Sequence, residues 1–422
     1  MSPRRTRRGL MRNGDFMTNT KKALIIVENC YVPLDVRVWQ ESTTLRDDGW
    51  NVVVICPAPS GPHAEHPGSA SPDAPVNLEG ITVFYFPVKA AKAGVVGYLT
   101  EYLTAFREIA KCTQRVWRQG RFDILHICNP PDIFFPLAWF YRLQGVRIIF
   151  DHHDLFPEFV SHRFRGGWGK LFYWLARATE YLTYRCAHVV IAVNESYRQI
   201  AMARGRIQPE QLVIVRNGPR SDKFVPIAPL SSLKKETPFL ACYVGIMGHE
   251  DGVLETIASI RHVVQDLKRQ DIRFALIGDG AIRPQALQQI RDWGLADFVE
   301  MPGMILDKLV VRQYLSTADV CLSPEPLTPL NAHSTFIKVG EYMAMGKPIV
   351  AYDLNETRWT ARDAAVYITP GDVHGFGRAI THLVDDPVQR TTMGNFGRKR
   401  FLESLSWEHQ KGNLLAVYNA GI

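Results

Sequence analysis

Two charged side chains stand at a spacing that suits recognition of a nucleotide phosphate and its ribose. Lys338 and Glu341 are three residues apart in STFIKVGEYMAMGKP, so a helix would place both on one face. Lys338 would lie in the first turn, where its charge opposes the positive end of the helix dipole. A bound diphosphate would remove that conflict, and Glu341 would accept hydrogen bonds from ribose hydroxyls. Taken alone, the pair is equally compatible with an ordinary surface contact.

A helix cap and glycine-rich turns are expected around this segment. Ser334 or Thr335 would cap the helix that carries the lysine. Gly245 and Gly248 follow the apolar stretch FLACYV, and Gly278 follows RFALI. A backbone without side chains lets a phosphate approach closely. A plain tight turn is the alternative interpretation of each glycine.

A cluster of titratable side chains follows the apolar segment VRIIF in the first half of the chain. Its sequence is DHHDLFPE, with two histidines between carboxylates, a combination that can hold a metal ion. The chain has no HExxH, DxD or comparable ligand spacing elsewhere, so we predict no metal site. We expect the cluster to lie at the carboxyl end of a strand, where ligands of parallel sheets bind.

Apolar strands and helices alternate along the chain around these residues. Typical strands are KALIIVEN, NVVVICP, FDILHIC and HVVIAVN in the first half, and FLACYVG, RFALIGDG, DVCLSP and PIVAYD in the second. Such alternation predicts parallel sheets covered by helices on both faces. Residues 226–238 resemble a linker, after which the pattern starts again. The predicted fold class is therefore α/β, with two Rossmann-like domains whose sheets face each other across a cleft.

Length and composition agree with this organisation. The 422 residues suit two domains of roughly 200 residues each. Residues 1–20 are expected to form a disordered basic tail, residues 21–225 the N-terminal domain and residues 226–405 the C-terminal domain. The chain is 46% hydrophobic and 22% charged, which is ordinary for a globular protein and excludes disorder of the whole chain.

Charge and cysteine content narrow the choice of partner and compartment. The net charge of +7 favours anionic partners, but no nucleic-acid-binding module is recognisable, so we expect no nucleic acid partner. Seven cysteines occur without a CxxC pair, several of them in apolar strands, which indicates a reducing compartment. No signal peptide is evident, and no apolar run reaches the roughly 20 residues of a membrane span. A cytoplasmic location is expected.

Several motifs together resemble the family-four glycosyltransferases of the GT-B fold. The resemblance covers roughly residues 22–420 and rests on PLDVRVWQE, FDILHICNPPD, DHHDLFPE, VRNGPRSDKF, YVGIMGHEDGV, LIGDG, STADVCLSPEP, STFIKVGEYMAMGKPIVAYD and SWE. Members retain the anomeric configuration and need no divalent metal, and the chain is especially similar to those that assemble bacterial surface polysaccharides. The resemblance implies an N-terminal acceptor domain, a C-terminal domain that binds a nucleotide sugar, and a final helix, 406–422, that crosses back to the acceptor domain.

The resemblance also assigns roles to residues of the donor site. Lys338 matches the lysine that binds and stabilises the diphosphate, and Glu341 matches the second glutamate of the E-x7-E motif, which holds the donor ribose. The first glutamate of that motif is replaced by His333. Ser334 and Thr335 are expected to substitute for part of its contacts. The loops GIMGHEDG and IGDG match the glycine-rich loops that approach the phosphates.

Further roles follow for the cluster in the first domain and for the first loop. His153 matches the histidine that contacts the donor sugar near the reacting carbon, with Asp154 orienting it. Asp251 stands where many relatives have a lysine, so one cationic phosphate contact is absent. Asp35 and Arg37 lie where acceptor and donor meet. Arg37 would bind an acceptor phosphate or, equally, form a structural salt bridge.

The predicted function is transfer of a sugar from a nucleoside diphosphate sugar, a substrate and not a cofactor, to a glycan or lipid-linked acceptor. A nucleotide-sugar isomerase and a non-catalytic subunit that binds a partner transferase are the alternatives. Residues 162–185 mix Arg and Lys with Trp, Phe, Tyr and Leu, which is typical of a helix at an anionic membrane surface. The protein would then be peripheral on the inner face of the membrane; burial of these aromatics against the sheet is the alternative.

Overall fold

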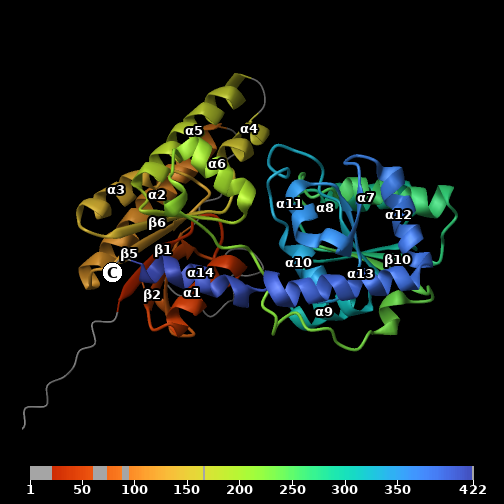
Figure 1. The fold of residues 1–422 in the computed structure, drawn as a ribbon. Helices are drawn as coiled ribbons and strands as arrows, with labels where there is room; N and C mark the ends of the chain where they lie inside the picture. The colour runs from red at the N-terminus through yellow and green to blue at the C-terminus, as the bar shows by residue number, and fades with distance from the viewer. Residues whose placement is uncertain (1–20, 60–73, 88–94, 165–166, 421–422) are drawn as a thin grey trace, which may run out of the picture.

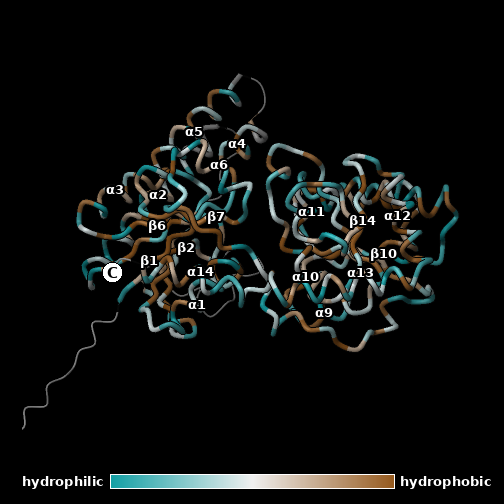
Figure 2. The backbone as a smooth tube through the Cα atoms, viewed as in Figure 1, coloured by the Kyte–Doolittle hydropathy of each residue, from teal (hydrophilic) through white to brown (hydrophobic). Residues whose placement is uncertain are grey.

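The computed structural model describes residues 21–59, 74–87, 95–164 and 167–420. Two domains lie side by side, each built on its own sheet (Figure 1). The backbone is most hydrophobic along the strands in the middle of each domain (Figure 2). The expected tail of residues 1–20 lies outside the described residues. Within the described part of the chain, every helix is too short or too polar to cross a bilayer.

The N-terminal domain contains an eight-stranded sheet in the order β3-β4-β2-β1-β5-β6-β7-β8. Its described strand pairs are parallel except for β3, which runs antiparallel to β4 at one edge. The inner strands are buried on both faces, which explains why they are continuous apolar runs. The strands are β1 (Lys22–Ile26), β2 (Asn51–Pro57), β3 (Val76–Leu78), β4 (Ile81–Phe86), β5 (Ile124–Cys128), β6 (Arg147–His152), β7 (Val189–Ala192) and β8 (Leu212–Ile214).

Helices from both ends of the chain cover this sheet. They are α1 (Val36–Asp47), α2 (Val95–Gln119), α3 (Phe135–Leu143), α4 (Phe156–Arg163), α5 (Gly167–Cys186), α6 (Glu195–Gly205) and the C-terminal α14 (Trp407–Asn419). In α14, Trp407 Nε1 donates to Thr44 Oγ1 at 2.9 Å, and Tyr418 packs edge-on against Trp50. The last helix therefore belongs to the core of the first domain, where Figure 1 shows it beside α1.

The C-terminal domain contains a six-stranded parallel sheet in the order β11-β10-β9-β12-β13-β14. Its strands are β9 (Phe239–Val244), β10 (Ile272–Ile277), β11 (Val299–Gly303), β12 (Val320–Ser323), β13 (Ile349–Tyr352) and β14 (Ala365–Ile368). Its helices are α7 (Val253–Arg261), α8 (Arg283–Asp292), α9 (Lys308–Thr317), α10 (Ile337–Ala344), α11 (Asn355–Ala361), α12 (Val373–Asp385) and α13 (Pro387–Arg400). A hydrophobic core lies on each face of the sheet, so the predicted class of two Rossmann-like domains is confirmed.

The start of α10 differs from the prediction. Phe336 occupies the N-cap position and makes no capping hydrogen bond with its side chain. The hydroxyl of Ser334 donates instead to Leu330 O at 2.9 Å, and that of Thr335 accepts from Asn194 Nδ2 at 2.9 Å. The predicted cap was wrong because both hydroxyls are used by the preceding loop and by the other domain.

Polar contacts join the two domains beside a cleft. Asn194, at the start of α6, also donates to His333 O at 2.8 Å, and Ser196 Oγ donates to Glu356 Oε1 of α11 at 2.6 Å. The cleft has a volume of about 1020 Å³ and is lined by loops that follow β1, β6, β9 and β12. These loops are at the carboxyl ends of parallel strands, where such sheets bind their ligands.

Candidate active site

The loops that follow β9 and β10 pack backbone against backbone. Gly278 has a φ of +143°, and a Cβ there would lie 1.8 Å from the carbonyl oxygen of Gly245. A Cβ on Gly280 would lie 2.5 Å from the carbonyl oxygen of Met247. Glycine is required for this contact, since any side chain would separate the loops. The result is a floor of main chain at the carboxyl edge of the sheet.

The amine of Lys338 lies over this floor. A Cβ on Gly245 would lie 2.8 Å from Lys338 Nζ, so the glycine makes room for the amine. The amine donates to Glu325 Oε1 at 2.5 Å and to the hydroxyl of Tyr243 at 3.1 Å, and Asp251 Oδ1 is 4.0 Å away. Glu325, two residues beyond β12, is therefore an anionic partner that the sequence did not reveal.

Lys338 is buried but remains charged. Burial disfavours the ammonium, but the negative charges of Glu325 and Asp251, together with Tyr243, outweigh it and raise the pKa of Lys338 above its ordinary value. An ammonium group has three N–H donors, and two of them are directed to Glu325 and Tyr243. One N–H is left for a ligand that lies on the glycine floor.

Glu341 lies one turn further along α10. Its carboxylate is partly buried, and burial raises the pKa of Glu341, with the nearby charges of Lys308 and Lys338 acting in the opposite direction. A carboxylate in such surroundings is stabilised by accepting hydrogen bonds from hydroxyl groups. The structure thus places Lys338 and Glu341 on one helix, as the spacing predicted, with the lysine amine over the glycine floor.

The glycine-rich loop after β9 contains Asp251, whose carboxylate binds a loop amide that a phosphate would otherwise contact. Gly248 N donates to Asp251 Oδ2 at 2.9 Å. Burial raises the pKa of Asp251, while the positive charge of Lys338 lowers it. A phosphate that contacts the amide of Gly248 must therefore displace the carboxylate of Asp251.

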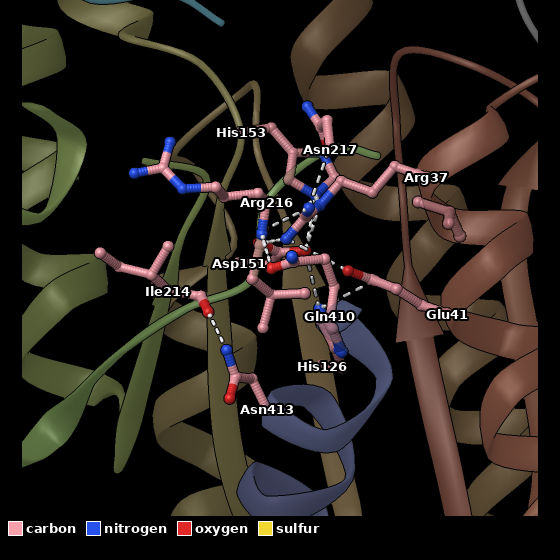
Figure 3. Close-up of polar contacts among 12 residues, drawn as sticks. Arg37, Glu41, His126, Asp151, His153, Ile214, Arg216, Asn217, Gln410 and Asn413 are labelled. Carbon is pink, nitrogen blue, oxygen red and sulfur yellow. Dashed lines mark hydrogen bonds and ion pairs between the residues drawn. The ribbon is translucent and has the colours of Figure 1, made fainter. Parts of the chain in front are cut away.

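Arg37 is the centre of a buried network in the first domain (Figure 3). Its Nε and Nη2 donate to the two carboxylate oxygens of Asp151 at 3.0 and 2.8 Å. Its Nη1 donates to Val215 O and Asn217 Oδ1, both at 2.8 Å, and Nη2 lies 3.2 Å from Glu41 Oε1. All three nitrogens of the guanidinium are thus engaged by the protein itself.

The two residues assigned to the acceptor are used elsewhere. Asp35 is the N-cap of α1 and accepts from Val38 N at 3.0 Å. Neither Asp35 nor Arg37 is among the described residues that line the cleft. The interpretation of Arg37 as a ligand of an acceptor phosphate was wrong, because Asp151 and its neighbours occupy the guanidinium. The salt-bridge alternative is what the structure shows.

His153 lies at the edge of the same network. Its Nε2 is 2.6 Å from Asp151 Oδ2 and 2.8 Å from Arg37 Nε. Asn129 fixes the backbone here, because its Oδ1 accepts from the amides of His153 and Asp154 at 2.6 and 3.1 Å. Asp154 itself lines the cleft. The resemblance had implied that Asp154 orients His153. In the structure the carboxylate that holds His153 is that of Asp151.

The network continues below Asp151 to the C-terminal helix. His126 Nε2 lies 3.4 Å from Asp151 Oδ2, and His126 Nδ1 lies 2.6 Å from the hydroxyl of Tyr418 in α14. Burial disfavours the Asp151 carboxylate, but Arg37 and then His153 hold the pKa of Asp151 well below its ordinary value. Asp151 is therefore ionised, and the guanidinium is its principal counter-charge.

Solved structures with the same architecture cover almost the whole chain. Sucrose-phosphate synthase from Thermosynechococcus elongatus has a TM-score of 0.74 at 17% identity, over 94% of this chain and 98% of that one. HepE from Anabaena, solved with UDP-glucose, has a TM-score of 0.69 at 13% identity, over 94% and 99% of the two chains. At these identities the likeness establishes the fold.

Two family models match consecutive parts of the chain. One, described as a glycosyl transferase 4-like domain, matches residues 34–218, and the other, described as glycosyl transferases group 1, matches residues 238–386. The chain belongs to the family-four glycosyltransferases of the GT-B fold. The family resemblance stated from the motifs is thereby confirmed.

Curated members of this glycosyltransferase family match over shorter segments. An MMP α-(1→4)-mannosyltransferase of Mycolicibacterium hassiacum is 25% identical over 176 residues, 41% of each chain. A lipopolysaccharide core biosynthesis glycosyltransferase, LpsE, of Rhizobium meliloti is 28% identical over 135 residues, 32% of this chain and 37% of that one. The matches thus span about two fifths of the length of these relatives.

Three groups of side chains in the described part of this GT-B chain could hold a metal ion, and two of them belong to the Arg37 network. These two share Asp151, and they are Glu41–Asp151–His153 and His126–Cys128–Asp151. The third, His262–Asp266–His374, lies elsewhere, just after α7 and in α12. Both carboxylate oxygens of Asp151 already accept from the guanidinium of Arg37. A divalent cation would have to share that carboxylate with a like charge about 3 Å from it, which is unfavourable. The cluster is therefore built around an arginine.

Several residues that hold the GT-B site together were not predicted from the sequence. They are Asn129, Asn194, Asn217 and Glu325. Asn129, Asn194 and Glu325 each stand one or two positions beyond a buried strand. Polar residues directly after apolar strands are thus the signal that would have found these three.

Proposed function

We propose that the protein transfers a sugar from a nucleoside diphosphate sugar to a hydroxyl group of an acceptor, with retention of the anomeric configuration and without a metal ion. The bond between the anomeric carbon and the diphosphate oxygen breaks, and the acceptor oxygen bonds to that carbon as its proton leaves. The observation that carries the proposal is the amine of Lys338 over a floor of main chain, with Glu341 on the same helix.

The geometry supports stabilisation of a leaving diphosphate. Lys338 is held in place by Glu325 and Tyr243, so little reorganisation is needed when negative charge develops on the phosphate. The positive end of the α10 dipole, one residue before Lys338, adds to the attraction. Glu341 would hold the ribose, and His153, held by Asp151, would contact the donor sugar.

The relatives support the substrate classes. The Anabaena protein was solved with UDP-glucose, and LpsE acts in lipopolysaccharide core biosynthesis. We infer a nucleotide-sugar donor and, as acceptor, a glycan or lipid-linked glycan of surface polysaccharide synthesis. The protein would act at the cytoplasmic face of a membrane.

The function is tested by incubating the purified protein with UDP, GDP and ADP sugars in EDTA. Binding raises the melting temperature, since a ligand of the native state stabilises it. Transfer releases the nucleotide only when an acceptor is present. Conversion of the donor without acceptor would support the isomerase instead, and neither binding nor turnover would support the non-catalytic subunit.

Glu341→Gln is expected to weaken nucleotide binding roughly tenfold, the effect of losing one hydrogen bond to a charged acceptor. The amide can accept one ribose hydroxyl where the carboxylate accepts two. Titration calorimetry with the nucleotide that binds wild type measures the change, and the melting temperature of the free variant should stay close to that of wild type. Equal affinity in the two proteins would remove Glu341 from the nucleotide site.

A surface of α3 and α5 carries exposed aromatic and aliphatic side chains, which we call the α3–α5 face. Its exposed members are Trp139, Phe140 and Leu143 of α3 and Trp168, Leu171, Trp174, Leu175, Tyr181 and Leu182 of α5. Lys170 and Arg185 are also exposed on α5, whereas the acid of this helix, Glu180, is fully buried. The face therefore presents apolar groups and positive charge, which suits an anionic membrane surface.

The exposure of this face favours the membrane interpretation of residues 162–185 over burial against the sheet. Trp168 and Trp174 are 64% and 67% exposed, so burial against the sheet does not explain them. Phe172 is half-buried and packs against Phe164, as the burial interpretation requires. Arg165 and the side chain of Arg163, which the sequence suggested for this surface, lie outside the described part of the chain.

Wild type is expected to co-sediment with vesicles that contain anionic lipid, with less binding at high salt. Replacing Lys170 and Arg185 by glutamine should lower the partition coefficient about fivefold for each residue, given roughly 1 kcal/mol per cation near the surface. A variant that lacks residues 1–20 separates the contribution of the basic tail. If that deletion alone abolishes binding, the α3–α5 face does not bind membranes.

A further inference from the structure

A second pocket adjoins the main cleft. It has a volume of about 350 Å³ and is enclosed by α4, α5 and the loop 324–336. Phe159, Glu250 and Leu330 line both this pocket and the main cleft, so the two spaces adjoin each other. The second pocket therefore lies beside the cleft, on the side of α4 and α5.

This second pocket lies beside α5, which carries part of the α3–α5 face. Tyr173 of α5 lines the pocket, and its ring packs edge-on against Trp174 at a centroid distance of 5.6 Å. Trp174 is 67% exposed. A residue that lines the pocket thus contacts a residue of the surface that we propose to contact a membrane.

The walls of both spaces are aromatic and acidic. Among their described lining residues, the charged side chains are all carboxylates, and no lysine, arginine or histidine is present. These carboxylates are Glu28, Glu101, Asp154, Glu158, Glu250 and Asp251, and the rings beside them are Tyr31, Phe86, Tyr102, Phe159, Tyr173 and Phe336. Arg204 pairs with Glu158, and Lys338 Nζ lies 4.0 Å from Asp251, so these two carboxylates have a cation behind them. Beside Glu28, Glu101 and Asp154 no cation is among the described lining residues, so a phosphate or carboxylate on the acceptor would be disfavoured there, whereas sugar hydroxyls would find hydrogen-bond acceptors.

Glu28, which follows β1, and Glu101 of α2 line the cleft from the N-terminal domain. Burial and then the charge of Glu101 raise the pKa of Glu28 to about 7. Burial also raises the pKa of Glu101. Near neutral pH Glu28 is therefore protonated in part of the molecules, so it can donate as well as accept a hydrogen bond. Such a pair is complementary to hydroxyl groups, which also donate and accept.

We propose that an amphiphilic acceptor enters through the second pocket, with an uncharged sugar in the main cleft and its apolar chain on the α3–α5 face. The inference rests on the proposed function and names its acceptor class: a glycolipid whose terminal sugar carries neither phosphate nor carboxylate. The proposed path runs from Trp174 past Tyr173 and Phe159 to Glu28.

The test measures binding of octyl glucoside, octyl galactoside and octyl mannoside, below their micelle concentrations, to the full-length protein with UDP present. Ser161 is exposed on α4 and lines the second pocket, so Ser161→Trp should fill it. We expect at least one octyl glycoside to bind wild type and to bind Ser161→Trp at least tenfold more weakly. The matched control is Ser231→Trp, an exposed position in the linker of the C-terminal domain.

Two further arms separate the entrance from the sugar site and from the proposed function. The methyl glycoside of the same sugar, followed by saturation-transfer NMR, should bind both proteins alike, and the 6-phosphate of the octyl glycoside should bind wild type at least tenfold more weakly. Equal binding of the octyl glycoside to Ser161→Trp, equal binding of its phosphate, or no binding of any octyl glycoside would overturn the proposal. Failure of UDP, GDP and ADP alike to bind would overturn the glycosyltransferase function separately, because glycoside binding is measured without turnover.

Discussion

Replacing Lys338 by alanine is expected to lower kcat/KM by about a hundredfold or more, the usual effect of removing one preorganised group that stabilises developing charge. The amine of Lys338 lies over Gly245, where we propose that the diphosphate binds, so the substitution removes a cation that would stabilise the leaving phosphate. The rate of nucleotide release from the donor sugar, in the presence of acceptor, is the measurement.

The same substitution affects stability, and a second variant separates the two effects. Lys338→Ala leaves Glu325 buried without its counter-charge, which destabilises a protein by about 3–5 kcal/mol. In the double variant Lys338→Ala/Glu325→Gln, the glutamine is neutral and retains an acceptor for Ser323 Oγ. We expect it to recover most of the lost stability and none of the activity. Near-native kcat/KM in the double variant would show that the lysine serves only to neutralise Glu325.

Sequence patterns predicted the layers of the fold, because a strand buried on both faces of a parallel sheet has apolar residues at consecutive positions. The strands VVVIC, ILHIC and FLACYV are of this kind, and the structure has them as β2, β5 and β9. Helix α13 (Pro387–Arg400) was not predicted, since its sequence PVQRTTMGNFGRKR shows little apolar periodicity. What fixes α13 is tertiary packing: Met393 and Gly397 are buried, with Gly397 against Ala364 and Met343.

Local spacing predicted the positions of site residues better than their partners. Lys338 and Glu341 share a helix, and a spacing of three residues is enough to recognise that relation. Glu325 meets Lys338 from a different loop, and Asn194 meets Thr335 from the other domain. Contacts of this kind depend on the order of strands in each sheet and on how the two domains pack against each other. Neither can be recognised from a short segment of sequence.

The second large effect is expected at Arg37. Arg37→Met should lower the free energy of unfolding by about 3–5 kcal/mol near pH 7.5, because the carboxylate of Asp151 would stay buried without its cation. A matched control is Arg46→Met on the same helix, where the arginine pairs with Asp47 near the surface. Loss of such an exposed pair changes stability by about 0–1 kcal/mol.

The pH dependence of this loss in unfolding free energy distinguishes a lost counter-charge from lost packing. In wild type the pKa of Asp151 is held well below its ordinary value, so its stabilising contribution is fully present above the unfolded pKa of about 3.9 and is lost as pH falls through the folded pKa. In Arg37→Met, burial acts on Asp151 without opposition from the guanidinium, and the pKa of Asp151 should rise. Protonation at lower pH then relieves the buried charge, so the difference in unfolding free energy between wild type and variant should narrow from pH 7.5 to pH 5. Urea unfolding at both pH values measures it, and a difference that stays constant would mean that Arg37 stabilises the domain through packing and hydrogen bonds alone.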